Sequence, residues 1–525
     1  MNLLQPLHIP LAGTTLIEAS AGTGKTYTIT TIFLRLLLEK KVGIDQILVV
    51  TFTIAATEEL RIKLSERLNL ANSWLRAPED CDYGQDPTLA ELLATVNSAE
   101  AQRLIGDAVA RLDDLSVYTI DAMCLRVLQD FAFESGLPMR IEMIADDTEI
   151  RRECAKDYWR HVIGSDDNFR IENLLAFARS PDSLLEQLQG VLQLRDAQII
   201  PAYDAERFQN LATDLHRQYA EIFLCWKNNS QRIREVFADE ANALNRNSYR
   251  EASKERIIEW LKTLGERLPA YVHKNFKLLT ADWMTQKTKG GCITPTHQFF
   301  NLCDEFEDKF NEYKKWQKVA AIVDARNFMP TAIDDYKSKR NLVHFEDMRS
   351  RLDRALAGDS AVVLAEKIRS LWPFALIDEF QDTDAEQFRI FNRVYAEQPD
   401  SGFFMIGDPK QAIYSFRGAD VFTYMNAVGQ AGNTYTLGTN WRSTPSMVNA
   451  VNAIFGSRND AFIFDRIPFS PVESVADHKK YELKIENETV APFKINLFDN
   501  HNKEAVAVAC ASDIAQLLNL SLIHI

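Results

Sequence analysis

Long apolar runs are missing from this sequence. No stretch approaches the ~18 consecutive apolar residues that a membrane-spanning helix needs. The first residues, Met1–Gln5, lack the basic start and following apolar run of a secretory signal. Internal repeats and low-complexity tracts are also absent. With 46% hydrophobic and 25% charged residues, the composition excludes a disordered chain and predicts a globular protein with no membrane partner.

Cysteines are few and scattered. There are seven of them, an odd number, and no two are spaced as Cys-x-x-Cys. This pattern excludes a disulfide framework and a structural zinc site, and it is typical of a protein in the reducing cytoplasm. The cysteines are Cys81, Cys124, Cys154, Cys225, Cys292, Cys303 and Cys510.

Basic residues are outnumbered by acidic ones. Lys and Arg total 59 and Asp and Glu total 74, so the formal net charge is −15. This balance argues weakly against a surface coated with nucleic acid, but it leaves room for a local basic groove. At about 150 residues per domain, a chain of 525 residues predicts three to four domains.

Strand-like and helix-like segments alternate in two parts of the chain, which is typical of a parallel sheet covered by helices. In the first part we expect strands at Thr15–Ala19, Gln46–Phe52 and Leu115–Ile120 and helices at Tyr27–Lys40 and Ala55–Leu68. In the second part we expect strands at Phe374–Phe380, Phe403–Ile406, Thr434–Leu437 and Pro492–Phe498 and a helix at Ala505–Leu518.

The segment between these two parts reads as a helical insertion. It is charged, has helical periodicity and contains five of the eight tryptophans, for which helix packing is favoured over stacking on bases. The sequence therefore predicts an α/β domain in two pieces, 1–140 and 341–432, interrupted by a helical insertion at 141–340. A second α/β domain is expected to begin at 433 and run to 525.

A glycine-containing loop lies between the first expected strand and helix. In this context backbone N–H groups converge on phosphates, and the helix N-terminus adds positive potential. Lys25 is placed to reach the β- and γ-phosphates and the Thr26 hydroxyl to bind Mg²⁺. The loop consists of Ala19, Ser20, Ala21, Gly22, Thr23, Gly24, Lys25 and Thr26.

Two adjacent carboxylates follow four apolar residues at Phe374–Ile377. Idle carboxylates at the end of a buried strand would be costly, so their position indicates a function. Asp378 is expected to hold Mg²⁺ through water, and Glu379 to orient and deprotonate an attacking water. Together with the loop, this predicts hydrolysis of Mg²⁺-bound ATP.

Four further segments narrow the prediction. They are Thr51–Ala56, Asp378–Asp382, Gly407–Asp420 and Asn440–Ser443. Their order resembles superfamily 1 DNA helicases of the UvrD/Rep type. The amino-acid sequences of four segments are similar to those of the RecB family, the 3′→5′ helicase and nuclease subunits of bacterial exodeoxyribonuclease V. These segments are 16–26, 133–136, 407–414 and 422–425.

The resemblance implies roles for single residues. Gln411 would sense the γ-phosphate, Arg442 would act as an arginine finger, and Trp441 would stack on adenine. It also implies RecA-like motor domains, RecC-like and RecD-like partner subunits, and single-stranded and duplex-end DNA as substrates. The residues expected to contact single-stranded DNA are Phe52, Thr53, Tyr414, Phe416 and Arg417, with core packing as the alternative for the three aromatics.

The sequence departs from the family in three places. Asp121 stands where relatives carry a DNA-contacting histidine, and only Gln5 is available as an adenine-reading glutamine. Later helicase motifs and a nuclease domain are absent, so we expect the chain to end inside the second motor domain. A UvrD/Rep- or AddA-type helicase, or an ATP- and DNA-binding fragment without productive turnover, remain the alternatives.

Overall fold

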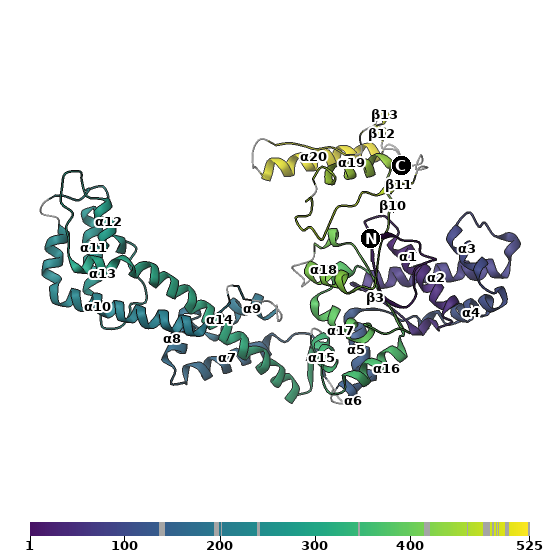
Figure 1. The fold of residues 1–525 in the computed structure, drawn as a ribbon, viewed down its shortest axis with the longest axis horizontal. Helices are drawn as coiled ribbons and strands as arrows, with labels where there is room; N and C mark the ends of the chain where they lie inside the picture. Colours follow the sequence, from purple (N-terminus) through teal and green to yellow (C-terminus); the bar gives the residue numbers. More distant parts are fainter. Residues whose placement is uncertain are drawn as a thin grey trace. The chain divides into compact units, whose positions relative to one another are not determined.

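The chain forms two compact units in the computed structural model (Figure 1), one made of residues 1–143 and 343–525 and the other of 144–342. The second unit covers the stretch for which the sequence predicts a helical insertion. The structure describes residues 1–135, 142–193, 199–200, 202–238, 242–344, 347–413, 420–458, 460–475, 484–485, 488–489, 491, 493–498 and 503–522.

A parallel sheet of seven strands lies at the centre of the first unit (Figure 1). Its order is β1-β9-β2-β8-β7-β3-β4 and every neighbouring pair is parallel. The fold class predicted from the sequence, a parallel α/β sheet, is therefore confirmed. In chain order the strands are β1 (Asn2–Leu3), β2 (Gly13–Glu18), β3 (Ile47–Thr51), β4 (Val117–Thr119), β7 (Phe374–Ile377), β8 (Gly402–Gly407) and β9 (Asn433–Thr436).

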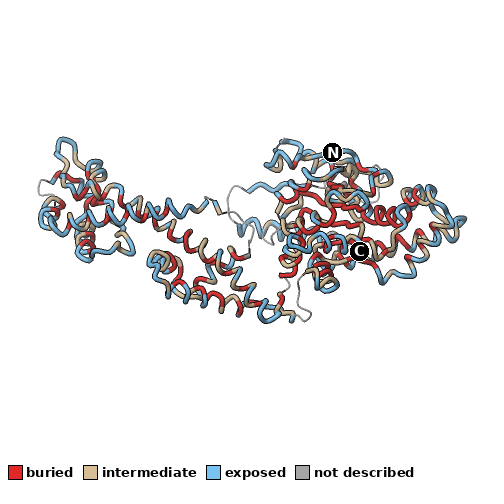
Figure 2. Tube along the Cα trace, turned by 60° about the horizontal axis from the view of Figure 1, so that its bottom comes forward, coloured by how far each residue is buried: buried red, intermediate tan, exposed pale blue. Residues whose placement is uncertain are grey.

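Helices pack against both faces of this sheet, and its central strands β2, β3, β7 and β8 are mostly buried, as the interior of the first unit shows (Figure 2). The edge strand β1 is exposed, and β9 is half-buried. Successive side chains of a strand point to opposite faces, so Ile17 packs into one hydrophobic core and Leu16 into the other. The first core contains α1 (Lys25–Glu39), α2 (Ile54–Arg76), α3 (Pro87–Thr95) and α4 (Ser98–Ala110). The second contains α5 (Ile120–Asp130), α15 (Asp347–Ala355), α16 (Ala361–Leu371), α17 (Ala385–Tyr395) and α18 (Val421–Gln430).

The region after residue 432 differs from the prediction in two respects. A second α/β domain is predicted to begin at residue 433, but β9 pairs with β2 along Thr15–Glu18 and so belongs to the first sheet. The strand expected at Pro492–Phe498 is wrong for residues 493–498, which are all exposed and outside any strand. The remaining elements are β10 (Thr439–Asn440), α19 (Pro445–Phe455), β11 (Glu473–Ser474), β12 (Lys484–Ile485), β13 (Glu488–Thr489) and α20 (Lys503–Leu522), the last confirming the expected helix.

The second unit is helical and has two hydrophobic cores that share one long helix, α14 (Phe306–Lys339). One core joins the first half of α14 to α10 (Ala205–Ala238), α11 (Glu251–Lys262), α12 (Ala281–Gln286) and α13 (Gln298–Asp304). The other joins its second half to α7 (Thr148–Ile163), α8 (Asn168–Phe177) and α9 (Pro181–Gln193). Trp226 and Trp260 are buried in the first core, so they serve helix packing.

Short elements flank the point at which the chain leaves and re-enters the first unit. They are α6 (Ala132–Ser135), β5 (Glu142–Ile144) and β6 (Leu342–His344). Across the described ranges, no helix has both the length and the apolar character needed to cross a membrane. All seven cysteines are free thiols, and burial raises the pKa of the Cys124 and Cys303 thiols.

Candidate nucleotide site

The glycine-containing loop joins β2 to α1, as the sequence predicts. Gly22 and Gly24 have φ angles of 76° and 96°, which only glycine adopts without strain. The helix begins at Lys25, and neither an acidic residue nor a side-chain cap occupies its first turn. Its first N–H groups therefore remain available to an anion, and the positive end of the helix faces the same space.

The two carboxylates follow β7 directly, because the chain turns sharply there. The strand ends at Ile377, and Glu379 has a φ of 51°, a left-handed conformation that is strained for a residue with a side chain. The Asp378 N–H donates to the Val50 carbonyl at 2.9 Å, which holds the turn against β3. Strained backbone of this kind is common at functional sites.

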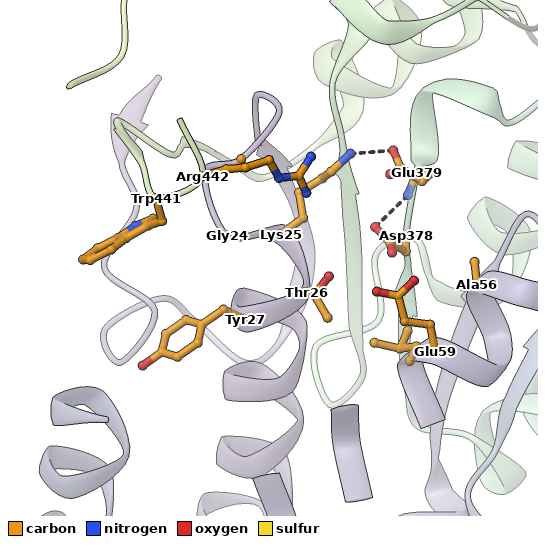
Figure 3. A pocket seen from close by; sticks show the side chains of 12 residues that line it. Gly24, Lys25, Thr26, Tyr27, Ala56, Glu59, Asp378, Glu379, Trp441 and Arg442 are labelled. Atoms are coloured by element: carbon orange, nitrogen blue, oxygen red, sulfur yellow. Dashed lines mark hydrogen bonds and ion pairs between the residues drawn. The ribbon is translucent and has the colours of Figure 1, made fainter. Parts of the chain in front are cut away.

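An ion pair links the carboxylates to the phosphate loop. Lys25 Nζ lies 2.6 Å from Glu379 Oε2 (Figure 3). Asp378 Oδ1 accepts the N–H of Glu379 at 2.9 Å, so both carboxyl groups are held at the mouth of the loop. The lysine that is expected to bind phosphate is thus already paired with a negative charge.

Burial makes the charge of Asp378 costly. It raises the pKa of this carboxyl to about 6, the negative charge of Glu379 adds to the increase, and Lys25 opposes it. A divalent cation beside Asp378 would favour its ionised form. The Asp378 carboxylate and the Thr26 hydroxyl line one cavity and are oxygen ligands that suit Mg²⁺, which keeps several waters of its own. No cluster of three or more His, Cys, Asp or Glu that could hold a metal occurs among the described residues.

Residues that follow β9 brace the phosphate loop from the other side. Asn440 Nδ2 donates to the Ala21 carbonyl at 2.9 Å, and the Trp441 N–H donates to the Gly22 carbonyl at 2.8 Å. A Cβ atom on Gly22 would lie 2.8 Å from the Cβ of Arg442, so only glycine permits this approach. The segment thereby places Trp441 and Arg442 over the loop.

These residues enclose a cavity of about 410 Å³ (Figure 3). Ligand pockets of this kind range from about 300 to 1,000 Å³, so a nucleotide is a suitable size. Most of the candidate nucleotide residues line it. The candidates that do not are Ala19, Ser20, Ala21 and Thr23 of the loop, together with Gln5 and Gln411. The lining residues are Gly22, Gly24, Lys25, Thr26, Tyr27, Ala56, Glu59, Leu60, Asp378, Glu379, Trp441 and Arg442.

Tyr27 is a lining residue that the sequence analysis missed. It and Trp441 lie on the same side of the cavity in Figure 3. The Tyr27 hydroxyl donates to Asp86 Oδ1 at 2.5 Å, and the Arg67 guanidinium lies 4.0 Å from the centre of the ring. Tyr27 is therefore a fixed aromatic wall beside the more exposed Trp441. The sequence signal that could have identified Tyr27 is its position directly after Thr26, the last residue of the phosphate loop.

Gln411 is hydrogen-bonded to the side chain of a residue in its own turn. Its amide Nε2 donates to Asp408 Oδ2 at 2.7 Å. Gln411 is half-buried in a short turn after β8. The structure therefore brings Lys25, Glu379 and Arg442 together at one cavity and holds Gln411 in the neighbouring turn.

The candidate DNA contacts are only partly described. Tyr414, Phe416 and Arg417 lie outside the described residues. Phe52 is half-buried and lines a second, smaller cavity of about 130 Å³, and the exposed Thr53 caps α2 by accepting the Ala56 N–H. Both lie directly after β3.

Asp121 lies on the wall of that second cavity, and its charge is compensated. Arg349 Nε lies 3.1 Å from Asp121 Oδ1, and Arg349 Nη1 lies 2.9 Å from Asp384 Oδ2. The negative charge in place of a histidine was evident from the sequence, but its partner Arg349 was not predicted. The two residues are 228 positions apart by their numbers (349 − 121), and no local pattern joins them.

Comparison with known proteins agrees with this geometry. A family model described as UvrD/REP helicase N-terminal domain matches residues 3–431. The chain is 33% identical over 539 residues to the RecBCD enzyme subunit RecB of Escherichia coli strain K12, across 98% of this chain and 44% of that protein. It is 32% identical over 565 residues to the protein of the same name from Haemophilus influenzae, across 98% of this chain and 46% of that protein. The chain thus spans less than half the length of these curated relatives.

Proposed function

Because the chain belongs to the UvrD/REP helicase family and resembles RecB over nearly its whole length, we propose that it works as a RecB-type ATP-dependent 3′→5′ DNA helicase. The observation that carries the proposal is the cavity in which Lys25, Asp378 and Glu379 meet Trp441 and Arg442. Its proposed setting is double-strand-break repair in the bacterial cytoplasm, with RecC-like and RecD-like subunits and duplex DNA ends as partners.

The proposed reaction begins with an exchange of partners at Lys25. The γ-phosphate of ATP draws Lys25 Nζ away from Glu379, because an ammonium group binds phosphate oxygens strongly. Glu379 is then able to accept a proton from a water molecule, whose oxygen attacks the γ-phosphorus. The bond from that phosphorus to the bridging oxygen breaks, and ADP and inorganic phosphate form.

The other residues of the cavity bind and stabilise. Thr26 and Asp378 would hold Mg²⁺, which when bound neutralises charge on the β- and γ-phosphates. The N–H groups at the start of α1 bind the phosphates, and Arg442 offsets the charge of the transition state. Trp441 stacks on the adenine.

DNA is proposed to pass close to the end of β3. Phe52 and Thr53 follow this strand, and α2, which they introduce, also carries Glu59 and Leu60 to the nucleotide cavity. The segment from the end of β3 to the first turns of α2 thus borders both regions. Tyr414, Phe416 and Arg417 are proposed to complete the contact with single-stranded DNA, and Gln411 to connect it with the phosphate site.

The proposal is tested by ATP hydrolysis with and without single-stranded DNA, and by strand separation on duplexes with a 3′ or a 5′ tail. We expect DNA-stimulated hydrolysis and unwinding of the 3′-tailed duplex only. Nucleotide binding without any turnover would contradict the motor function and favour the alternative of a binding module. Preference for the 5′ tail would contradict the polarity.

Replacing Trp441 by alanine should weaken ATP binding about tenfold, because base stacking on an aromatic side chain contributes about 1–3 kcal/mol. The Trp441 side chain is 61% exposed, so its removal leaves no cavity in a core. Titration with a fluorescent ATP analogue measures the effect, and Trp441→Phe, which keeps an aromatic face, serves as the control. Equal affinities in wild type and Trp441→Ala would exclude a stacking role.

A further inference from the structure

Gln381 is a buried amide that joins Glu379 to a separate part of the chain. Gln381 is one of the least exposed polar residues, with 2% of its surface accessible. Gln381 Oε1 accepts the backbone N–H of Asp408 at 2.8 Å, and Gln381 Nε2 donates to Glu379 Oε2 at 2.7 Å. Because a backbone N–H can only donate, the orientation of the amide is fixed.

The approach of Gln381 to β8 depends on Gly407. A Cβ atom at residue 407 would lie 2.6 Å from Gln381 Oε1 and 3.0 Å from the Gln381 backbone nitrogen. A glycine at the end of β8 therefore provides the space in which the amide makes its two hydrogen bonds. This close packing leaves the amide little freedom to take another position.

The turn that receives Gln381 is anchored by buried charges. Lys410 Nζ lies 2.9 Å from Asp408 Oδ1 and also pairs with Glu18, the last residue of β2. Burial disfavours the charge of Lys410, but Asp408 and Glu18 outweigh this effect and raise its pKa. The second oxygen of Asp408 accepts Gln411 Nε2. Asp408 is thus fixed from three sides.

Glu379 Oε2 has two partners, Lys25 and Gln381. In the proposed reaction, nucleotide binding removes Lys25 from this oxygen but leaves Gln381 in place. Lys25 is drawn to the phosphate in the proposed reaction, whereas Gln381 lies beneath the site and is not among the residues that line the cavity. When Lys25 leaves, the Gln381 amide is the remaining one of these two partners. It donates to the same oxygen and so limits rotation of the carboxylate.

We propose that Gln381 is a positioning residue that keeps the Glu379 carboxylate aimed at the attacking water and ties it to the turn bearing Gln411. This inference rests on the proposed hydrolysis of ATP. It predicts that Gln381 affects the rate of the chemical step and not the binding of nucleotide, because Gln381 does not line the cavity.

The first test compares Gln381→Met with Gln317→Met in steady-state ATP hydrolysis at saturating single-stranded DNA. Gln317 is the matched control, since it is 3% exposed and its amide also uses both a donor and an acceptor, to Tyr313 and Lys314 in the helical unit. We expect Gln381→Met to lower kcat by about 10- to 100-fold, as misplacement of a catalytic group does, with KM nearly unchanged. Gln317→Met should leave kcat near the wild-type value. Equal kcat in Gln381→Met and wild type would overturn the inference.

A second variant separates the two hydrogen bonds. Gln381→Glu keeps an acceptor for the Asp408 N–H and nearly the same shape, but it places a carboxylate against Glu379 instead of a donor. We expect a kcat as low as that of Gln381→Met. A wild-type kcat in Gln381→Glu would mean that only the bond to Asp408 matters, and the proposed role of the bond to Glu379 would be wrong.

A binding measurement distinguishes failure of this inference from failure of the proposed function. If the wild-type chain does not hydrolyse ATP, the proposed function fails. The affinity for ADP with aluminium fluoride, a mimic of the transition state, is then compared with the affinity for ADP alone. We expect Gln381→Met to weaken binding of ADP with aluminium fluoride about tenfold or more and to leave the affinity for ADP alone unchanged. An unchanged ratio would overturn the positioning role.

Discussion

Replacing Glu379 by glutamine should lower kcat for ATP hydrolysis by about 10²- to 10⁴-fold, the usual contribution of a general base. ATP affinity should stay the same or increase, because the variant no longer forms the ion pair with Lys25, whose nitrogen now lies 2.6 Å from the carboxylate. Single-turnover hydrolysis and a nucleotide titration measure the two quantities separately.

The control for this variant is Glu397→Gln. Glu397 also has a left-handed backbone, with a φ of 58°, but it is exposed at the end of α17 and is not among the residues that line the cavity. Any effect of the substitution on backbone strain is therefore shared, and kcat should not change. If Glu379→Gln retained the wild-type kcat, Glu379 would not be the base.

Replacing Lys25 by alanine should abolish measurable hydrolysis and weaken ATP binding by roughly 10- to 100-fold, since a hydrogen bond to a charged group contributes about 1.5–3 kcal/mol. Two effects add. The phosphates lose a cation, and the carboxylates of Asp378 and Glu379 lose the positive charge that offsets theirs. Without Lys25 the pKa of Asp378 rises further, which also disfavours the metal-binding form.

Lys40→Ala is the matched control for Lys25→Ala. Lys40 caps the opposite, C-terminal end of the same helix and is exposed. Removing its charge should leave both ATP affinity and hydrolysis at wild-type values. ATP binding by Lys25→Ala that equals wild type would contradict the assignment of the loop as a phosphate site.

Much of the first sheet could be predicted because its central strands are short runs of apolar residues, many of them β-branched or aromatic. The expected strand at Gln46–Phe52 corresponds to β3, and that at Phe403–Ile406 to β8. The prediction failed where a pairing partner decides the outcome. Residues 493–498 alternate in polarity, yet no strand among the described residues pairs with them. β9 looked like the start of a new sheet because nothing local shows that it pairs with β2.

The candidate site shows the same difference between residues with a local sequence signal and residues that depend on a distant partner. Lys25, Thr26, Asp378 and Glu379 were identified because each stands at a recognisable strand end or helix start, and they line one cavity. Gln381 lies within the segment Asp378–Asp382, but the sequence predicts no role for it, because its hydrogen bonds depend on the position of Asp408. Arg349 was missed because its partner, Asp121, is distant in the sequence. Local patterns predict the candidate reactive residues, whereas the residues that hold them in place depend on the tertiary structure.

The strand order also bears on how the protein is made. In the sheet, β2 lies between β8 and β9, and β3 lies between β4 and β7. Strands synthesised before the helical insertion thus lie interleaved with strands synthesised after it, with β8 beside β7 and β3 beside β4. On the ribosome, β2 lacks both neighbours until β8 has emerged, and it lacks β9 until Thr436 has emerged. Residues 144–342, with two cores of their own, are complete much earlier. The insertion can therefore fold first, and the nucleotide cavity forms late in synthesis, when the first half of the sheet meets the second.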